Sequence, residues 1–355
     1  MIMISILTPC FNHEKYIKYY LQSVLEQSFQ DFELIIVDDY STDNSIQEIQ
    51  KFNDSRIKLI KHEFNKGINA TLNTAFENSN GEYIVLCASD DILEKNALEV
   101  IYQTFKDSDV DVIYPNISII DENNVFQKKN RYSSKENIDI LNHIFFKGNC
   151  LASVGMSIRT TFFKKIYPLD NSMCNHQDTK MHVELILNNS KILFLKEHLI
   201  QYRISSESAS ISARIDSTII RENLEINFLM DSFLKIKDEK LLENIFKNEI
   251  EKTKIKPYGN TLEFFLGRMA LESEDKFRKI WGYHKIMKFY NEINNVKILN
   301  EKYNFTFKDY LALVKLFKSE KFFKKYKKYK RVSFILIYII VFELIVIGIL
   351  SWLIF

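Results

Sequence analysis

Two pairs of aspartates each follow an apolar run of the sequence. Asp38 and Asp39 come directly after FELIIV, and Asp90 and Asp91 end the stretch YIVLCASDD. Carboxylates that converge repel one another unless a cation or a hydrogen-bonding ligand lies among them. Mg²⁺ and Mn²⁺ favour oxygen ligands and typically take one or two carboxylates together with substrate phosphates. The pairs therefore predict a site for a divalent cation and a nucleoside diphosphate. For either pair alone, a solvated turn or a helix cap is the alternative.

The elements that must position these carboxylates alternate between strand and helix patterns. Strand-like apolar runs lie at 4–8, 32–37, 57–61, 83–87 and 110–114. Between them, helical spacing of apolar residues predicts helices at 14–28, up to about residue 52, at 68–79 and at 96–106. This order predicts an α/β fold with a mainly parallel sheet flanked by helices. Ligands bind beyond the carboxyl ends of such strands, so the polar clusters at 8–12, 38–43 and 89–91 should converge on one cleft.

The second half of the chain reads differently. Residues 115–205 are less regular, and 213–320 read as successive amphipathic helices with breaks near Pro257–Gly259 and Gly282. The sequence contains neither G-x-G-x-x-G nor G-x-x-x-x-G-K-[ST], which argues against a classical dinucleotide fold and a P-loop NTPase. The net charge is +2, but the basic excess lies in one short segment near the end, and residues 1–320 are slightly acidic. We therefore expect no nucleic-acid partner.

The end of the sequence combines basic and apolar segments. Residues 321–331 hold seven Lys and Arg side chains, and 332–355 hold eighteen Leu, Ile, Val and Phe residues with a single charge, Glu343. A helix over 332–355 would be about 36 Å long, enough to cross a hydrocarbon core of about 30 Å. The pattern predicts one C-terminal transmembrane helix preceded by a polybasic segment. The positive-inside rule places the basic segment, and the body of the chain that precedes it, on the cytoplasmic side of the inner membrane. A buried core helix after a solvated charge run is the alternative.

The strand-end motifs occur together as ISILTPCFN, LQSVLEQSFQDFELIIVDDYSTDNS and NKGINATLNTAFENSNGEYIVLCASDD. In this order and spacing, the chain resembles family 2 glycosyltransferases of the bacterial cell-envelope type. The resemblance covers about residues 3–205 and is strong over 3–95. It implies a GT-A domain over 1–205, with a nucleotide-sugar-binding half at 1–114 and an acceptor half at 115–205. A helical region at 206–320 follows this domain.

The resemblance assigns roles to residues of this sequence. Those expected to bind the donor are Thr8, Pro9, Phe11, Asn12, Asp39, Lys66, Gly67, Asn73, Ser89, Asp90 and Arg203. Asp39 matches the acid that reads the base, usually uracil. Asp90 matches the last carboxylate of the D-x-D element and is the expected ligand of Mn²⁺ or Mg²⁺, with Asp91 as an alternate or supporting ligand. For Arg203, an ordinary surface arginine is the alternative.

Asp178 is the expected general base. It follows His176-Gln177 and precedes the helix-like TKMHVELIL, where the family often carries Glu-Asp. The resemblance implies that it deprotonates the acceptor hydroxyl. On spacing alone, a helix N-cap is the alternative. His176 and His182 match no H-E-x-x-H pattern and are expected to be ordinary polar or helix residues.

Together these features predict an inverting, metal-dependent hexosyltransferase that moves a sugar from a nucleotide-sugar, expected to be a UDP-sugar. The membrane tail suggests a lipid-linked glycan acceptor in surface polysaccharide or glycoconjugate synthesis. Three positions depart from the family pattern: Ala88 replaces the first Asp of D-x-D, Tyr40 a frequent Gly, and Gln177 the frequent Glu. Ala88 leaves open an inactive nucleotide-binding module that anchors a membrane complex. An unrelated nucleotidyltransferase is a second alternative.

Overall fold

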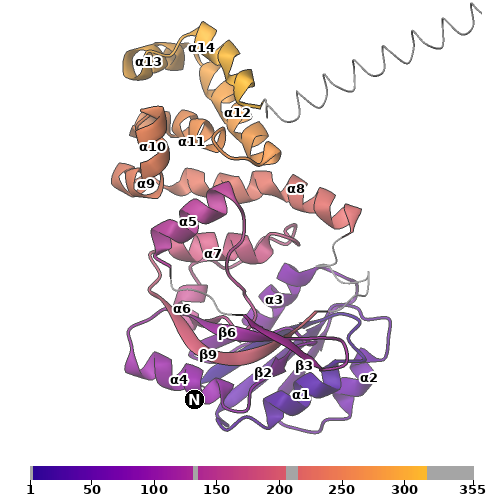
Figure 1. The fold of residues 1–355 in the computed structure, drawn as a ribbon. Coiled ribbons are helices and arrows are strands. Elements are labelled where there is room, and N and C mark those ends of the chain that lie inside the picture. The colour runs from indigo at the N-terminus through magenta and orange to yellow at the C-terminus, as the bar shows by residue number, and fades with distance from the viewer. Residues whose placement is uncertain (1–2, 131–134, 205–214, 318–355) are drawn as a thin grey trace, which may run out of the picture.

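The computed structural model describes residues 3–130, 135–204 and 215–317. These residues form a β-sheet covered by helices, with a further stack of helices beyond one of its faces (Figure 1). The predicted polybasic segment at 321–331 and the predicted transmembrane helix at 332–355 lie outside the described residues. Within the described ranges, no helix is both long and apolar enough to cross a membrane.

The sheet that the described residues form has nine strands, in the order β3-β2-β1-β4-β8-β6-β9-β5, with β7 paired to β6. The strands are β1 (Ile4–Cys10), β2 (Phe32–Asp38), β3 (Ile57–Lys61), β4 (Tyr83–Leu86), β5 (Ile92–Leu93), β6 (Val112–Ile120), β7 (Phe126–Asn130), β8 (Ser157–Arg159) and β9 (Ile192–Arg203). β1 to β4 are parallel neighbours, and β9 is parallel to β6. β8 is antiparallel to both β4 and β6, β7 is antiparallel to β6, and β5 is antiparallel to β9.

The expectation of a mainly parallel sheet is therefore correct for β1 to β4 and for the pair of β6 and β9. The complete sheet is mixed, because β5, β7 and β8 run antiparallel to their neighbours. The three antiparallel strands, β5, β7 and β8, were not predicted from the sequence, for a physical reason. β5 has two residues and β8 has three, too few to show a period. β7 (FQKKN) is exposed along its whole length, so it carries no apolar signal.

Two layers of helices cover the sheet. The helices that lie between its strands in the sequence are α1 (Ile17–Leu25), α2 (Ser45–Gln50), α3 (Ile68–Glu77), α4 (Ala97–Asp107), α5 (Asn137–Phe146), α6 (Thr160–Phe163) and α7 (Gln177–Leu187). Side chains of β2 alternate between the layers. Leu34 and Ile36 belong to the same hydrophobic cluster as α1, α2 and α4, whereas Ile35 and Val37 belong to the cluster that holds α3, α5 and α7. Burial on both faces explains why β1 and β2 read as continuous apolar runs.

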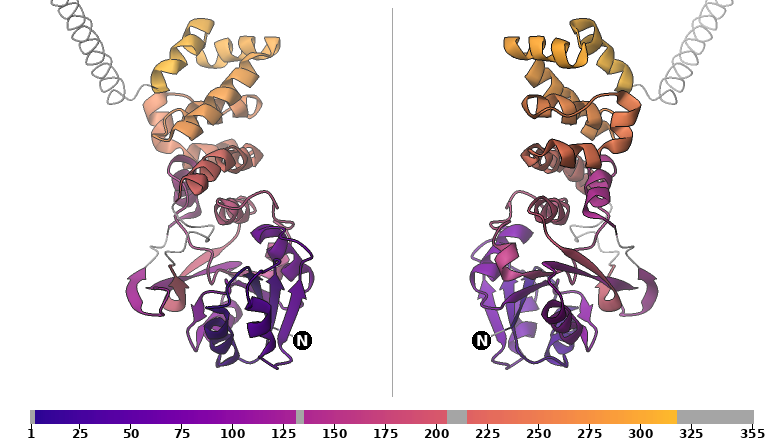
Figure 2. Two further views of the ribbon diagram at one scale, coloured as in Figure 1. Left: turned by 90° about the vertical axis from the view of Figure 1, so that its right-hand side faces the viewer. Right: turned by 90° about the vertical axis from the view of Figure 1, so that its left-hand side faces the viewer.

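The helical region continues the second layer. Its elements are α8 (Asp216–Asp231), η1 (Ser232–Lys235), α9 (Glu239–Ile245), α10 (Lys247–Thr253), η2 (Gly259–Thr261), α11 (Leu262–Ala270), α12 (Lys276–Tyr290), α13 (Ile293–Tyr303), α14 (Phe307–Ala312) and η3 (Leu313–Phe317). One hydrophobic core runs from the sheet through α5 and α7 into α8, α9, α11 and α12. The side views show these helices stacked above the sheet (Figure 2).

Gly282 does not break a helix as expected but lies inside α12. A Cβ atom at this position would lie 2.5 Å from the carbonyl oxygen of Gly267 on α11. The glycine pair therefore serves a close helix crossing rather than a turn. Near this crossing, the Arg278 guanidinium Nε donates to the Phe145 carbonyl of α5 at 3.0 Å. The helical region is thus tied to α5 in the helical layer over the sheet.

Candidate active site

The loops that follow β1 and β2 are joined by hydrogen bonds at the carboxyl edge of the sheet. The Asn12 amide donates to Ser41 Oγ at 2.9 Å, and Asn12 Oδ1 accepts from the Thr42 amide at 2.8 Å. The Glu14 amide donates to Asp43 Oδ2 at 3.0 Å. The predicted convergence of these two polar clusters is confirmed. Asn12 itself is left-handed, with φ +56°, a conformation that Asn tolerates better than most residues.

Asp39 is buried and binds three protein donors. Its Oδ1 lies 2.7 Å from His62 Nδ1 and accepts from the Lys66 amide at 2.8 Å, while Oδ2 accepts from the Gly67 amide at 2.8 Å. Gly67, which begins α3, has φ +88°, which favours glycine at this position. Asp39 thereby fixes the loop that carries Lys66. Its expected contact with a base stays a prediction.

Asp90 and Asp91 lie in different environments. The Asp90 side chain is 26% exposed, whereas Asp91 is fully buried. Asp91 Oδ1 accepts from the Arg203 amide at 2.9 Å, and its Oδ2 is buried without a hydrogen-bond partner. Burial, followed by the nearby Asp90 charge, raises the pKa of Asp91 well above its usual range. Asp90 is therefore the carboxylate that a cation can reach.

Arg203 is buried and uses its guanidinium within the protein. Nε donates to the Asp90 carbonyl at 2.7 Å, Nη1 to the Asp121 carbonyl at 2.8 Å and Nη2 to Asn124 Oδ1 at 2.6 Å. The group also lies 4.6 Å from the centre of the Tyr16 ring. Through these contacts Arg203 holds the backbone of Asp90 in place, within the segment Ala88–Asp91 that matches the D-x-D element. They do not bear out the alternative of an ordinary surface arginine.

The other expected donor residues divide into reachable and internal side chains. Phe11, Asn12 and Lys66 are exposed and Pro9 is half-buried. Thr8 is fully buried against the Tyr20 hydroxyl. The Asn73 side chain binds the Leu169 backbone. Its Nδ2 donates to the Leu169 carbonyl at 2.9 Å, and its Oδ1 accepts from the Leu169 backbone N–H at 2.8 Å. Ser89 is also buried.

Within the described residues, no three His, Cys, Asp or Glu side chains are grouped as a complete protein metal site. A cation that binds a diphosphate needs only one or two protein ligands, because phosphate oxygens supply the others. The partly exposed Asp90 carboxylate, backed by the unpartnered Asp91 oxygen, fits such a cation.

Asp178 lies in the first turn of α7, where His176 is the residue that precedes the helix, so Asp178 is not the N-cap. Its Oδ2 accepts from Asn149 Nδ2 at 3.1 Å and its Oδ1 from the Thr179 amide at 2.6 Å. Burial raises the pKa of Asp178 to about 6. A carboxyl group with this pKa is ionised at neutral pH and is a stronger base than an ordinary aspartate.

Asp178 lines a pocket of about 360 Å³ beside β6, β7 and β9. The pocket is lined by Ile117, Ile119, Lys128, Asn130, Leu151, Ala152, Ser153, Val154, Asp178, Tyr202 and Ile204. Tyr202 precedes Arg203 on β9, and consecutive strand residues face opposite sides. The end of β9 therefore contributes to both sites. Arg203 lies against Asp90, and Tyr202 lines the pocket that holds Asp178.

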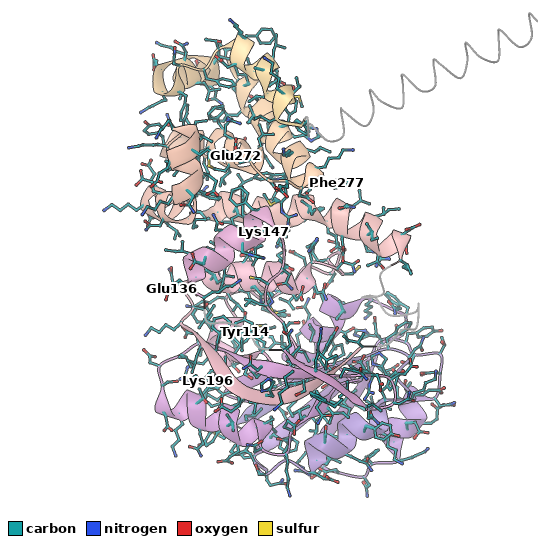
Figure 3. All side chains as sticks on the ribbon, viewed as in Figure 1. Tyr114, Glu136, Lys147, Lys196, Glu272 and Phe277 are labelled. Carbon is teal, nitrogen blue, oxygen red and sulfur yellow. The ribbon has the colours of Figure 1, made fainter. Side chains whose placement is uncertain are left out.

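Two contacts that sequence reasoning missed hold α7. The Tyr114 hydroxyl of β6 lies 2.8 Å from His182 Nδ1, one turn after Asp178, and Figure 3 marks Tyr114 at this junction of sheet and helices. Glu225 of α8 accepts from the amides of Cys174, Asn175 and His176 at 3.1, 2.9 and 2.8 Å. Neither contact has a local sequence signal, because the partners lie far apart along the chain.

This mixed sheet, flanked by helices and followed by a helical region, is an α/β fold of the GT-A type. TarS from S. aureus, whose residues 1–349 were solved in complex with UDP, shares this fold with a TM-score of 0.52 at 20% identity, over 85% of this chain and 91% of that one.

The sequence comparisons define the family. The model described as "Glycosyl transferase family 2" matches residues 5–167. An uncharacterized glycosyltransferase of Methanocaldococcus jannaschii is 30% identical over 218 residues, which are 59% of this chain and 73% of that protein. The Escherichia coli UDP-Glc:alpha-D-GlcNAc-diphosphoundecaprenol beta-1,3-glucosyltransferase WfgD is 36% identical over 126 residues, 36% of this chain and 50% of that protein. The chain belongs to glycosyltransferase family 2.

Proposed function

We propose that this protein is an inverting glycosyltransferase that moves a sugar from a UDP-sugar to a hydroxyl group of a lipid-linked glycan. The observation that carries the proposal is the position of Asp178, a carboxyl group with a pKa of about 6 that lines a pocket. The end of β9 connects this pocket to the Asp90 site, because Tyr202 lines the pocket and Arg203 binds the Asp90 carbonyl. UDP in the S. aureus TarS structure supports the donor class. The diphosphoundecaprenol acceptor in the name of the E. coli relative supports the acceptor class.

In this mechanism, an ionised Asp178 oxygen takes the proton of the acceptor hydroxyl. The acceptor oxygen attacks the anomeric carbon as the bond from that carbon to the diphosphate breaks, so the configuration inverts. Asn149 and the Thr179 amide hold the carboxylate in place. At the other end of the donor, Asp90 would hold the cation, and Arg203 fixes the backbone of Asp90. Bound Mn²⁺ or Mg²⁺ would offset charge that develops on the leaving diphosphate.

The predicted membrane helix at 332–355 and the basic segment at 321–331 agree with a lipid-linked acceptor. We propose that they hold the enzyme on the cytoplasmic face of the inner membrane, where such an acceptor would be presented. The product would then be a surface polysaccharide or glycoconjugate.

The test is a donor panel with the purified full-length protein in detergent and Mn²⁺ or Mg²⁺. UDP- and GDP-sugars are offered together with polyprenyl-diphosphate-linked sugars, and released nucleotide is measured. We expect UDP release that requires the acceptor and Asp178. Asp139→Asn is a matched control, because Asp139 is an exposed aspartate in the first turn of another helix, α5. UDP binding without transfer to any acceptor would instead favour the inactive binding module. Consumption of a nucleoside triphosphate with release of diphosphate would favour a nucleotidyltransferase.

A further inference from the structure

One histidine lies against the D-x-D segment and has no role in the function proposed above. His13 follows Asn12 in the loop between β1 and α1. Its Nδ1 lies 2.7 Å from Ser89 Oγ, and its Nε2 lies 3.9 Å from Asp90 Oδ2. The ring thus spans the two residues that end the element in which Ala88 replaces the usual first carboxylate.

The backbone of His13 is fixed from both sides, so this placement of the ring is built into the fold. Its amide donates to Ser45 Oγ at 2.8 Å. Its carbonyl accepts from the amides of Tyr16 and Ile17, each at 2.9 Å, at the start of α1. The ring therefore projects from a loop that is hydrogen-bonded to its neighbours, not from a free surface turn.

The two ring nitrogens have different surroundings. Ser89 is fully buried, so its Oγ is a fixed partner for Nδ1. The 3.9 Å between Nε2 and Asp90 Oδ2 is too long for a hydrogen bond. Both side chains are about a quarter exposed, at 27% and 26%, so both are open to solvent and to a ligand. A histidine that binds a metal ion through one nitrogen usually donates the other N–H to an oxygen, as Nδ1–H would donate to Ser89 Oγ here.

We propose that His13 Nε2 and Asp90 together bind the divalent cation of the donor diphosphate, so that a neutral nitrogen ligand stands in for the carboxylate absent at Ala88. This inference rests on the proposed function and adds a ligand to its donor site. A mixed nitrogen and oxygen ligand set favours Mn²⁺ over Mg²⁺, because imidazole suits transition metals and Mg²⁺ prefers oxygen. The site is therefore a manganese-selective version of the D-x-D element.

The test measures binding and not turnover. Mn²⁺ is titrated into the full-length protein with saturating UDP, and free Mn²⁺ is followed by electron paramagnetic resonance. Pulsed measurements on the bound ion then detect nitrogen coupling from a ligating imidazole. We expect this coupling in the unaltered protein and its loss in His13→Ala. Mn²⁺ affinity should fall at least about tenfold, and Mg²⁺ affinity, measured by competition, less than about threefold.

Controls separate this inference from general damage. His284→Ala removes an exposed histidine of α12 and should change neither metal affinity. His13→Gln keeps a side chain of similar reach with an oxygen donor, and should retain the fold while losing the nitrogen coupling. Bound Mn²⁺ that depends on Asp90 but shows no nitrogen coupling would overturn the role of His13 and leave the donor site intact. Bound Mn²⁺ that is indifferent to Asp90→Ala would overturn the donor site itself.

Discussion

The donor edge and the acceptor side position their carboxylates by different means. At the donor edge, Asp39 and Asp91 accept hydrogen bonds from backbone amides of neighbouring strand ends and loops of the sheet. On the acceptor side, Asp178 lies on a helix whose entry is held by Glu225 of α8, from outside the sheet. The proposed donor site thus belongs to the sheet edge, whereas the position of the proposed base, Asp178, depends on how the helical region packs against α7. Changes at the two places should therefore separate donor binding from transfer.

The largest expected effect is at Asp178. Asp178→Asn removes the base but keeps the shape, so transfer should fall about 10³-fold, within the range for general bases. UDP affinity, measured by calorimetry, should change less than about twofold, because the donor edge is untouched. If UDP affinity fell along with transfer, the two regions would not be separable in the way that the contacts suggest.

Asp90→Asn tests the donor edge, where a loss of UDP binding is expected together with the loss of transfer. We expect transfer to fall about 10²-fold, in line with the loss of one group that stabilises leaving-group charge. Metal-dependent UDP binding should weaken in parallel, whereas Asp178→Asn leaves it unchanged. Calorimetry with and without Mn²⁺ checks this, and retained metal-dependent binding would remove Asp90 from the cation site.

The raised pKa of Asp178 predicts opposite trends for activity and stability. Only the ionised group accepts a proton, so kcat should fall about tenfold per pH unit below about 6 and level off above it. In the unfolded chain the pKa is about 3.9, so ionising this half-buried group in the folded protein costs stability as the pH rises from about 4 to 6. Asp178→Asn should therefore raise the free energy of unfolding by about 2–3 kcal/mol at pH 8 and leave it nearly unchanged at pH 3. Thermal denaturation beside Asp139→Asn checks the sign.

Glu225→Ala tests whether the helical region supports the base. Three amides before α7 would lose their acceptor, so we expect kcat to fall about tenfold and stability to fall by about 1–3 kcal/mol. UDP affinity should stay the same, and Glu225→Gln should recover part of kcat because it still offers an oxygen acceptor. Glu243→Ala, at an exposed position of α9, is the matched control. An equal fall in kcat in both alanine variants would assign the effect to general destabilisation.

The smallest effect is expected at Tyr40, which is 53% exposed and has φ +67°. A left-handed conformation costs a non-glycine residue about 1–2 kcal/mol, and glycine costs about 0.5–1 kcal/mol in unfolded-state entropy. Tyr40→Gly should therefore raise stability by no more than about 1 kcal/mol, measured by urea denaturation. A clear loss of stability would mean that the tyrosine ring makes a contact that outweighs the strain.

The sequence by itself determined the donor edge. Buried parallel strands leave continuous apolar runs, and polar residues that follow them must meet at one edge. Local pattern therefore predicted that the strand ends converge, and family resemblance supplied the donor roles of Asp39 and Asp90, which stay predictions. The structure decided what each side chain does there. It gave Thr8, Asn73 and Arg203 internal partners, and it placed His13 beside Asp90. Hydrogen-bond partners that lie far apart along the chain leave no periodic signal that a single sequence could show.

The acceptor side shows the same limit more strongly. Resemblance proposed Asp178 as the base, but the bond from Asn149 to Asp178 and the bonds from the amides before α7 to Glu225 join segments that lie 29 to about 50 residues apart. The short strands β5 and β8 and the exposed β7 turned the sheet from parallel to mixed without an apolar pattern. Gly282 looked like a helix break but lies at a close helix crossing, because only tertiary packing brings α11 against it. Local pattern determines which elements form, and the packing of distant elements decides which side chains can reach a substrate.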